Sequence, residues 1–292
     1  MKRILSDMCF TFHKKRDTII MNILCVGDIV GKPGRCALEG LLAGIKEEFD
    51  IGFTIVNAEN AAGGSGITPN IAEELFNLGC DVVTLGDHVW DQKEVEVCLK
   101  DEEHLVRPAN FPEGAPGKGW CIKTTPSGVK IGVVNLLGRV FMRYYVNCPF
   151  RALESIVGEI RKQTPNIIVD MHAEATSEKV ALGHFIDGRV SAVVGTHTHI
   201  QTADEKILSK GTAYITDLGM TGPYDSVIGQ NKEKIIQRFL SSIPVRFSVA
   251  QDDVRLHGAV LTIDEKTGKA KNIVRVQKSF MVHSGTAENE EK

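Results

Sequence analysis

The sequence predicts an α/β fold in which two mixed sheets pack face to face with helices on the outside. Short apolar runs that are typical of buried strands alternate with amphipathic segments along most of the chain. Toward the C-terminus, apolar and polar residues alternate as in antiparallel strands. Polar side chains follow several of the apolar runs, at the strand ends where such folds place their ligands.

The first half of the chain predicts three strands and two helices. A strand over about 21–27 leads through a Gly-rich turn into an amphipathic helix in the region 35–49. FTIVNAEN is the second strand, and the loop AAGGSGIT (61–68) after it contains glycines that permit close backbone approach. Thr68 caps and Pro69 begins a helix that ends near Gly79. DVVTLG is the third strand.

The second half predicts a long loop followed by more strands. Residues 107–120 are rich in Pro and Gly and indicate a loop. Strands are expected at 131–138 and 166–172, with a helix at 152–163 between them. Two further strands cover 190–199 and 212–219. VRFSVA, GAVLTID and NIVRVQK are expected as antiparallel strands.

Composition limits the classes of partner. The 292 residues, of which 42% are hydrophobic and 24% charged, suit one large globular domain or two small ones. The formal net charge is −3 and no Lys/Arg run rises above the background, so a long nucleic acid is not an expected partner. A small anion can still be attracted by bound metal.

Cysteine usage and hydropathy indicate a cytoplasmic protein. The seven cysteines are odd in number and include no CxxC pair, which favours reduced thiols over disulfides or a zinc site. No apolar run approaches the roughly 20 residues of a membrane span. Residues 1–20 lack the unbroken apolar segment of a secretory signal, so we expect an extension there, a single domain over 21–280 and a disordered tail over 281–292.

Metal-binding residue types gather after the predicted strands. Clustered carboxylates and imidazoles at the ends of buried strands favour a metal hydrolase over a plain structural core. Each residue alone has a simpler interpretation: Asp28 suits an Asx-turn, a lone strand-end His is usually structural, and THTH can be a polar loop. The candidates are Asp28, Glu59, Asn60, Asp87, His88, His172, His197 and His199.

Six ordered blocks resemble a known family. GDIVGKPGR, NAEN, GDHVWD, DMHAEATSEK, GTHTHIQTAD and TDLGMTGPYDSVIG are similar to the signature blocks of calcineurin-like metallophosphoesterases. More closely they resemble the YmdB-like bacterial branch, whose members hydrolyse cyclic nucleotides. The match runs from Met21 to about Lys278. The resemblance implies a four-layer α/β/β/α sandwich, two metal ions, most often iron or manganese, and a homo-oligomer.

The resemblance also implies a ligand set. One metal would be held by Asp28, Glu59, Asn60 and His199, and the other by Glu59, Asp87, His172 and His197, with Glu59 bridging. The DxH motif of the wider superfamily is Asp28-Ile29-Val30 here, and Asn60 is the substitute for the missing histidine.

Asp87 is a departure from the branch, which usually has Gly-Asn-His where this chain has Gly86-Asp87-His88. A carboxylate still ligates metal, but it adds negative charge and removes an amide donor. Activity or metal preference is therefore expected to differ from that of relatives.

The expected function is hydrolysis of 2′,3′- or 3′,5′-cyclic nucleotides by a metal-bridging hydroxide. His88 is the expected proton donor or charge stabiliser, and the lesser alternative is that it only supports the ligands. Asp91 or Asp170 is expected to orient a histidine. The native metal and the preferred nucleotide stay open.

Other interpretations remain for the protein and for single residues. Asp87 motivates a nucleotide-sensing regulatory protein with weak turnover, and a metal-dependent amidohydrolase has little weight because the HxH pair comes late. Thr176–Lys179 either contact the ligands or the substrate or form a helix N-terminus, and Arg107 and Asn110 either meet substrate or belong to a surface loop. Trp90 is expected in the core.

Overall fold

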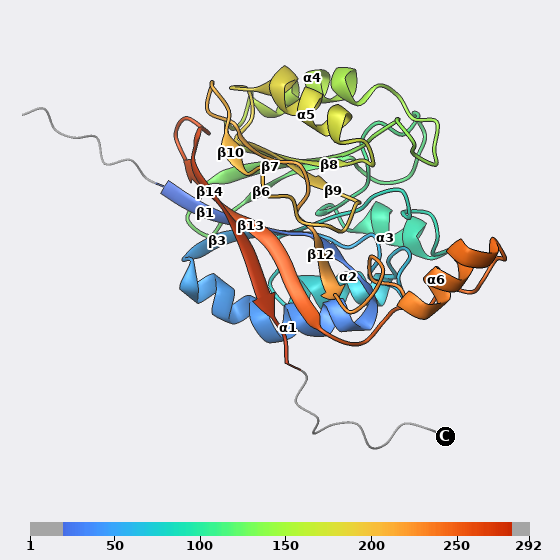
Figure 1. The fold of residues 1–292 in the computed structure, drawn as a ribbon. Coiled ribbons are helices and arrows are strands. Elements are labelled where there is room, and N and C mark those ends of the chain that lie inside the picture. Colours follow the sequence, from blue (N-terminus) through green and yellow to red (C-terminus); the bar gives the residue numbers. More distant parts are fainter. Residues whose placement is uncertain (1–19, 282–292) are drawn as a thin grey trace, which may run out of the picture.

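The computed structural model describes residues 20–281 and arranges them in two packed sheets with helices on both outer faces (Figure 1). The first sheet contains β1 (Ile20–Val26), β2 (Asp28–Ile29), β3 (Ile51–Asn57), β4 (Val82–Thr84), β5 (Leu105–Val106), β12 (Met220–Pro223), β13 (Val254–Asp264) and β14 (Ala270–Ser279). The second contains β6 (Trp120–Thr124), β7 (Lys130–Leu137), β8 (Ile167–His172), β9 (Ala192–Thr196), β10 (Lys206–Ile207) and β11 (Ala213–Ile215).

The described residues form six helices, four of which cover the outer faces of the sheets. They are α1 (Gly31–Glu48), α2 (Pro69–Asn77), α3 (Val95–Asp101), α4 (Pro149–Ile160), α5 (Thr176–Ile186) and α6 (Lys232–Ser241). In Figure 1, α4 and α5 lie on the outer face of the second sheet and α1 and α2 on the outer face of the first. The expected four-layer α/β/β/α arrangement of two mixed sheets is therefore confirmed.

Parallel strands form the centre of each sheet. The first sheet runs β2-β12-β13-β1-β3-β4-β5, in which β1, β3, β4 and β5 are mutually parallel and β13 is antiparallel to β1. The second runs β10-β11-β9-β8-β7-β6, with antiparallel strands only at its two edges. Parallel strands bring their carboxyl ends to one side, so residues that follow them meet there.

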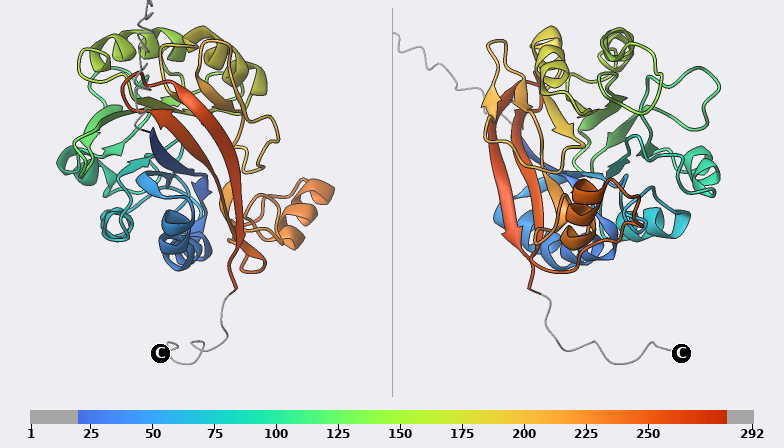
Figure 2. Two further views of the ribbon diagram at one scale, coloured as in Figure 1. Left: turned by 90° about the vertical axis from the view of Figure 1, so that its left-hand side faces the viewer. Right: turned by 45° about the vertical axis from the view of Figure 1, so that its right-hand side comes forward.

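Figure 2 shows the two sheets between the outer helices, and three apolar clusters hold these layers together. Leu38 and Leu42 of α1 belong to a cluster between the first sheet and its helices. Ile23 and Ile131 belong to the layer between the two sheets, and Leu153 of α4 belongs to a third cluster under α4 and α5. Strands buried on both faces explain why their sequences are continuous apolar runs rather than alternating patterns.

Local predictions are mostly confirmed, with two corrections. Thr68 caps α2 by accepting a hydrogen bond from the Ile71 backbone N–H at 3.4 Å. Helix α1 begins at Gly31 rather than near residue 35, because Pro33 is tolerated in a first turn. The expectation of a strand at VRFSVA (245–250) is wrong. That segment returns from α6 without regular structure and forms only an isolated bridge between Val249 and Gln230.

Some elements of the structure were not predicted, and the two predicted terminal segments fall almost entirely outside the described residues. Helices α3 and α6 were not expected, and neither was strand β6. The expected extension (1–20) and tail (281–292) fall outside the described residues except for Ile20, which opens β1, and Met281. Within the described part of the chain, no helix combines the length and apolar character needed to cross a membrane.

His257 is a buried histidine on β13 whose second nitrogen has no partner. Its Nδ1 lies 2.6 Å from the Tyr224 hydroxyl, and its buried Nε2 makes no hydrogen bond with a described residue. Burial, reinforced by nearby Arg255, lowers the pKa of His257 to about 4 from its usual 6.5. A second proton would thus leave an unpaired, charged N–H inside the protein.

This pKa predicts a loss of stability in mild acid. As pH falls below 6.5, His257 becomes protonated in the unfolded chain. In the native state it stays neutral until about pH 4. Between pH 7 and pH 5 this should cost about 2 kcal/mol of unfolding free energy. His257→Gln should remove that part of the pH dependence, measured by urea unfolding of both proteins at both pH values. Parallel pH dependences of the two proteins would contradict the assignment.

Candidate metal centre

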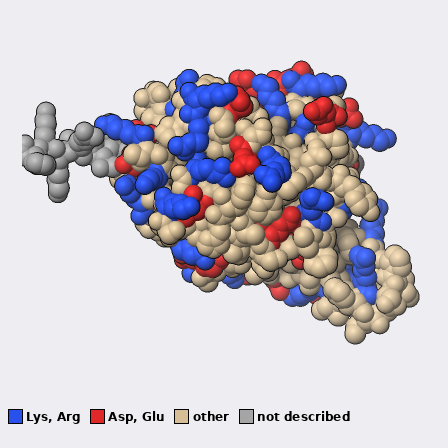
Figure 3. All heavy atoms as spheres, turned by 90° about the horizontal axis from the view of Figure 1, so that it is seen from above, with Lys and Arg blue, Asp and Glu red and all other residues tan. Residues whose placement is uncertain are grey.

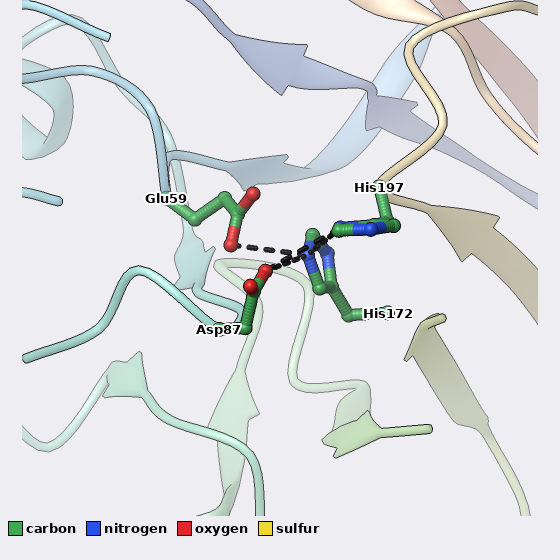
Figure 4. A group of neighbouring side chains, drawn as sticks. All are labelled: Glu59, Asp87, His172 and His197. Atoms are coloured by element: carbon green, nitrogen blue, oxygen red, sulfur yellow. Dashed lines mark hydrogen bonds and ion pairs between the residues drawn. The ribbon is translucent and has the colours of Figure 1, made fainter. Parts of the chain in front are cut away.

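The eight candidate residues converge where the parallel strands of both sheets end. Asp28 follows β1, Glu59 and Asn60 follow β3, and Asp87 and His88 follow β4. His172 is the last residue of β8, and His197 and His199 follow β9. Figure 4 shows side chains from both sheets pointing toward one point between them. The two halves of the sandwich therefore contribute to a single site.

One group of donors consists of two carboxylates and two imidazoles. Glu59 Oε2 lies 3.0 Å and Asp87 Oδ1 lies 3.3 Å from His172 Nε2. His197 Nδ1 lies 3.0 Å from the same nitrogen and 3.4 Å from Asp87 Oδ1. Four ligand atoms within this spacing, nearly all buried, can bind a metal ion.

A second group shares Glu59 with the first. The ligand atoms of Asp28, Glu59 and His199 all lie within 4.8 Å of one another. Asn60 joins them, because its Oδ1 lies 3.2 Å from His199 Nε2. His199 Nδ1 lies 2.9 Å from the Ile228 carbonyl, which holds the tautomer with a free electron pair on Nε2.

The two histidines of the HxH pair are separated by an unusual backbone. His197 has φ 98° and His199 has φ 65°, both in a region that non-glycine residues rarely occupy. Between them, Thr198 donates to Asp217 Oδ2 from its backbone N–H at 3.1 Å and its hydroxyl at 2.7 Å. The pair thus lies in a turn that follows β9 and that Asp217 holds in place. Each histidine belongs to a different group of donors.

Buried side chains next to the site hold Asp217 and His172 in position. Lys179 Nζ lies 2.8 Å from Asp217 Oδ2 and donates to the Thr196 carbonyl at 2.7 Å. Thr196 Oγ1 lies 2.9 Å from His172 Nδ1 and donates to Asp170 Oδ1 at 2.7 Å. Asp170 therefore orients His172 through Thr196, which leaves His172 Nε2 facing the other donors.

His88 is oriented by Asp91. Its Nδ1 lies 2.7 Å from Asp91 Oδ2 and 3.2 Å from the Ser65 hydroxyl, and its backbone N–H donates to Glu59 Oε2 at 3.3 Å. Arg143 Nη1 lies 3.0 Å from the second oxygen of Asp91. Although burial disfavours the charged imidazole, the Glu59 and Asp91 carboxylates raise the pKa of His88 above its ordinary value. Its side chain is 32% exposed, so the imidazole is accessible from solvent.

Additional positive charge would stabilise the buried carboxylates of the site. Burial raises the pKa of Asp28 to about 7, and Asp28 Oδ1 has no hydrogen-bond partner within the described residues. Burial alone would also raise the pKa of Glu59 and Asp87, but the His172 imidazole beside both of them lowers it. Three nearly buried carboxylates with one unpartnered oxygen suit cation binding, so the donor set fits metal ions.

Gly86 makes room for the donors. A Cβ atom at this position would collide with Glu59 Oε2 and with the His172 imidazole. The residue before Asp87 must therefore be glycine for the two strand ends to approach each other.

Other residues singled out in the sequence have structural roles. Arg107 donates to the backbone carbonyls of Pro108, Ala115, Pro116 and Gly117, and Asn110 bonds to the backbone of Leu137 and Asn147. Trp90 packs edge-on against Phe111, which agrees with the core position expected for it. Thr176 begins α5, as expected for a helix N-terminus, although Ala175 is the N-cap and no side chain caps it. Lys179 of the same segment also contacts Asp217 and so supports the ligands.

Four residues of the site were not recognised from the sequence as contacts. Glu174 Oε2 lies 3.3 Å from His197 Nε2, and Asp217 holds the HxH turn. Ser65 and Arg143 reach the His88–Asp91 pair from distant loops. Glu174 and Asp217 lie in the blocks DMHAE and TDLG that were noted for other reasons. Nothing in the sequence around Arg143 distinguishes it from a surface arginine.

Known proteins resemble this chain over most of its length. The family model described as YmdB-like protein matches residues 24–276. A 2′,3′-cyclic-nucleotide 2′-phosphodiesterase of Bacillus subtilis is 50% identical over 88% of this chain and 96% of its own length.

Two crystal structures share the fold. A hypothetical protein from Thermus thermophilus has a TM-score of 0.83 at 41% identity, covering 89% of this chain and 99% of its own. A novel phosphatase from Mycoplasma pneumoniae has a TM-score of 0.84 at 34% identity, covering 90% of this chain and 94% of its own.

The shared position of Glu59 predicts that one substitution disturbs both groups of donors. Mn²⁺ added to chelator-treated protein should raise the melting temperature by about 5 °C or more, because ions bind only the native state. Glu59→Gln should lose most of that rise, whereas Glu48→Gln on the surface of α1 should keep it. Differential scanning calorimetry with and without Mn²⁺ measures both. A full Mn²⁺ response in Glu59→Gln would show that Glu59 is not a ligand.

Proposed function

Since this chain belongs to the YmdB-like proteins, we propose that it is a metal-dependent phosphodiesterase that hydrolyses 2′,3′-cyclic nucleotides. The observation that carries this proposal is the half-identical Bacillus subtilis relative, which is named for that reaction and is matched over nearly its whole length. Activity on 3′,5′-cyclic nucleotides is part of the proposal, because both substrates present a cyclic phosphodiester. The convergence of carboxylate, amide and imidazole donors supports a metal-dependent reaction.

We propose that the two groups of donors hold two metal ions. Asp28, Glu59, Asn60 and His199 would hold one, and Glu59, Asp87, His172 and His197 the other. Mixed oxygen and imidazole donors suit iron or manganese. Two ions held there would supply positive charge opposite the phosphate oxygens and lower the pKa of bound water.

His88 is placed to act on the leaving group. Its Nδ1 lies 2.7 Å from Asp91 Oδ2, so Nε2 on the other side of the ring points away from Asp91. As the bond between phosphorus and the ribose 2′ oxygen breaks, Nε2–H can donate its proton to that oxygen, leaving a neutral imidazole. Ser65 and Arg143 act through Asp91 and Nδ1, so their role is to position His88.

Asp87 favours a second candidate, a nucleotide-sensing protein with weak turnover. Its carboxylate lies 3.3 Å from His172 and 3.4 Å from His197, where it adds a third negative charge to Asp28 and Glu59. That charge strengthens the hold on cations but repels a phosphodiester. The two candidates share one binding site and differ in rate.

We place this activity in the cytoplasm. The six cysteines among the described residues are all free thiols, and several are buried. Reduced thiols agree with a reducing compartment.

The function and the role of His88 can be tested together. With Mn²⁺ or Fe²⁺, the purified chain should convert 2′,3′-cyclic AMP to 3′-AMP, because the reaction breaks the bond to the 2′ oxygen. His88→Ala should lower kcat about 10²- to 10⁴-fold, as expected for loss of a general acid. Product analysis by chromatography and kcat measurement on both proteins provide the result.

The controls separate catalysis from metal binding. Metal content of His88→Ala should equal that of the native chain, and His184→Ala on α5 should keep native kcat. Full activity in His88→Ala would refute its role, and absence of cyclic-nucleotide hydrolysis in the metal-loaded native chain would refute the function.

Asp87→Asn distinguishes the enzyme from the sensor. Removing one negative charge should raise kcat/KM at saturating metal about tenfold, equivalent to about 1.4 kcal/mol of transition-state stabilisation. The comparison needs steady-state kinetics of both proteins with metal content measured in parallel. An unchanged kcat/KM would remove the reason for considering a weakened enzyme.

A further inference from the structure

The segment between β7 and α4 lies beside the metal centre. We call residues 138–148 the rim loop, and Figures 1 and 2 show it in green, projecting beyond the strand ends of the second sheet. It begins at Gly138, whose backbone N–H donates to the carbonyl of the candidate ligand His172 at 2.9 Å. The loop therefore leaves the sheet directly next to one donor of the site.

Two consecutive residues of the rim loop contact side chains or backbone that serve the site. Met142 Sδ accepts a hydrogen bond from the Glu174 backbone N–H at 3.3 Å, and Glu174 itself contacts a candidate ligand. Arg143 Nη1 lies 3.0 Å from Asp91, the residue that orients His88. The outer part of the loop is thus held along the His88 side of the metal centre.

Phe141, directly before these two anchors, has an unfavourable conformation. Its φ of 62° lies in the left-handed region, where a bulky residue is an outlier. The residue is also 88% exposed, so its ring is left in water. A strained backbone and an exposed ring both cost free energy, and burial in the native protein offsets neither of them. Strain that packing does not explain is typical of residues that contact a ligand.

The other aromatic residues of the rim loop have different surroundings. Tyr144 packs edge-on against Phe111, with 5.5 Å between the ring centres. Tyr145 lines a surface cavity of about 590 Å³ together with Phe150 of α4. Among the described residues of this loop, Phe141 alone combines an exposed aromatic ring with a left-handed backbone.

We propose that Phe141 is the platform on which the base of the cyclic nucleotide stacks. The proposal rests on the proposed function and follows from the connectivity of the substrate. With the phosphate at the metal centre, the 2′ oxygen lies at His88. The base is attached to C1′, the ribose carbon bonded to C2′, so it lies on the same side as His88. That is the side along which the rim loop is held.

Stacking recognises the face of a base rather than its edges. Every base has such a face, so this contact accepts all four bases, and purines offer the larger area. Two nearby polar side chains are engaged elsewhere. The Glu178 carboxylate accepts from two backbone N–H groups of the loop, at 3.0 and 3.2 Å, and Arg143 is paired with Asp91. We therefore expect hydrolysis of 2′,3′-cyclic nucleotides of all four bases, with purines preferred.

The expected ligand is a single nucleotide rather than the end of an RNA strand. RNA that ends in a 2′,3′-cyclic phosphate presents the same reactive group, but its backbone would need a basic track along the protein. Figure 3 shows Lys and Arg interspersed with Asp and Glu over the face seen from above. Charges of mixed sign on this face favour the smaller substrate.

The full chain loaded with Mn²⁺ tests the stacking contact. The measurement is kcat/KM for 2′,3′-cyclic AMP divided by kcat/KM for methyl riboside 2′,3′-cyclic phosphate, which lacks the base. Phe141→Asn should lower this ratio about tenfold, mainly by raising KM for 2′,3′-cyclic AMP. Asparagine tolerates a left-handed backbone, so the loop should keep its shape. Phe141→Trp should retain the native ratio, because its ring also stacks.

Tyr145→Asn is the matched control, since it removes a fully exposed ring from the same loop and should keep the native ratio. Melting temperature separates binding from structural support. Phe141→Asn should melt no lower than the native chain, because its backbone conformation suits asparagine better than phenylalanine. The proposal is overturned by an unchanged ratio in Phe141→Asn, or by a ratio that falls in Tyr145→Asn instead.

Failure of the proposed function gives a different result. If neither substrate is hydrolysed, titration calorimetry with 3′-AMP and with inorganic phosphate measures the stacking contact without turnover. Phe141→Asn should then weaken binding of 3′-AMP about tenfold and leave binding of inorganic phosphate unchanged. Equal affinity of the native chain for these two ligands would exclude stacking. A higher kcat/KM for a short RNA ending in a 2′,3′-cyclic phosphate than for 2′,3′-cyclic AMP would overturn the choice of a single nucleotide.

Discussion

The structure depends on concentrating negative charge where the two sheets meet. Asp28, Glu59 and Asp87 come from three strands of one sheet and are withdrawn almost completely from water. Their mutual repulsion and lost hydration oppose folding, and the His172 imidazole of the other sheet offsets only part of that cost. The sandwich therefore closes over a concentration of negative charge that bound cations would offset.

The surrounding fold keeps these groups from separating. The turn through His197 and His199 has unfavourable backbone angles, and Asp217 holds it by accepting three hydrogen bonds from Thr198 and Gly219. Lys179 neutralises Asp217 deep in the second sheet. Because the strain is local while its restraint comes from Asp217 beyond β11 and from Lys179 of α5, the positions of the histidines are fixed by tertiary structure rather than by local preference.

Periodicity was sufficient to predict most of the longer strands, although not β6, and strand-end chemistry was sufficient to predict which residues would approach one another. The left-handed turn at His197 and His199 was not predictable, because it depends on Asp217, twenty residues further along the chain. Arg143 was missed for the same reason, since its contact with Asp91 is set by loop geometry. VRFSVA has the alternation of a strand, but it lies beside α6 and no sheet edge is within reach.

Strand β1 lies between β3 and β13, so the first and nearly last parts of the described chain are neighbours. Its register with β13 extends from Ile20 opposite Asp264 to Val26 opposite Gly258. During synthesis on the ribosome, the β1 edge stays open until the β13 segment has emerged. Asp28 follows that edge directly, and the backbone N–H of Gly27 before it donates to the His257 carbonyl of β13 at 3.0 Å. The position of this candidate ligand near the start of the described chain is thus fixed by a strand more than 200 residues further along.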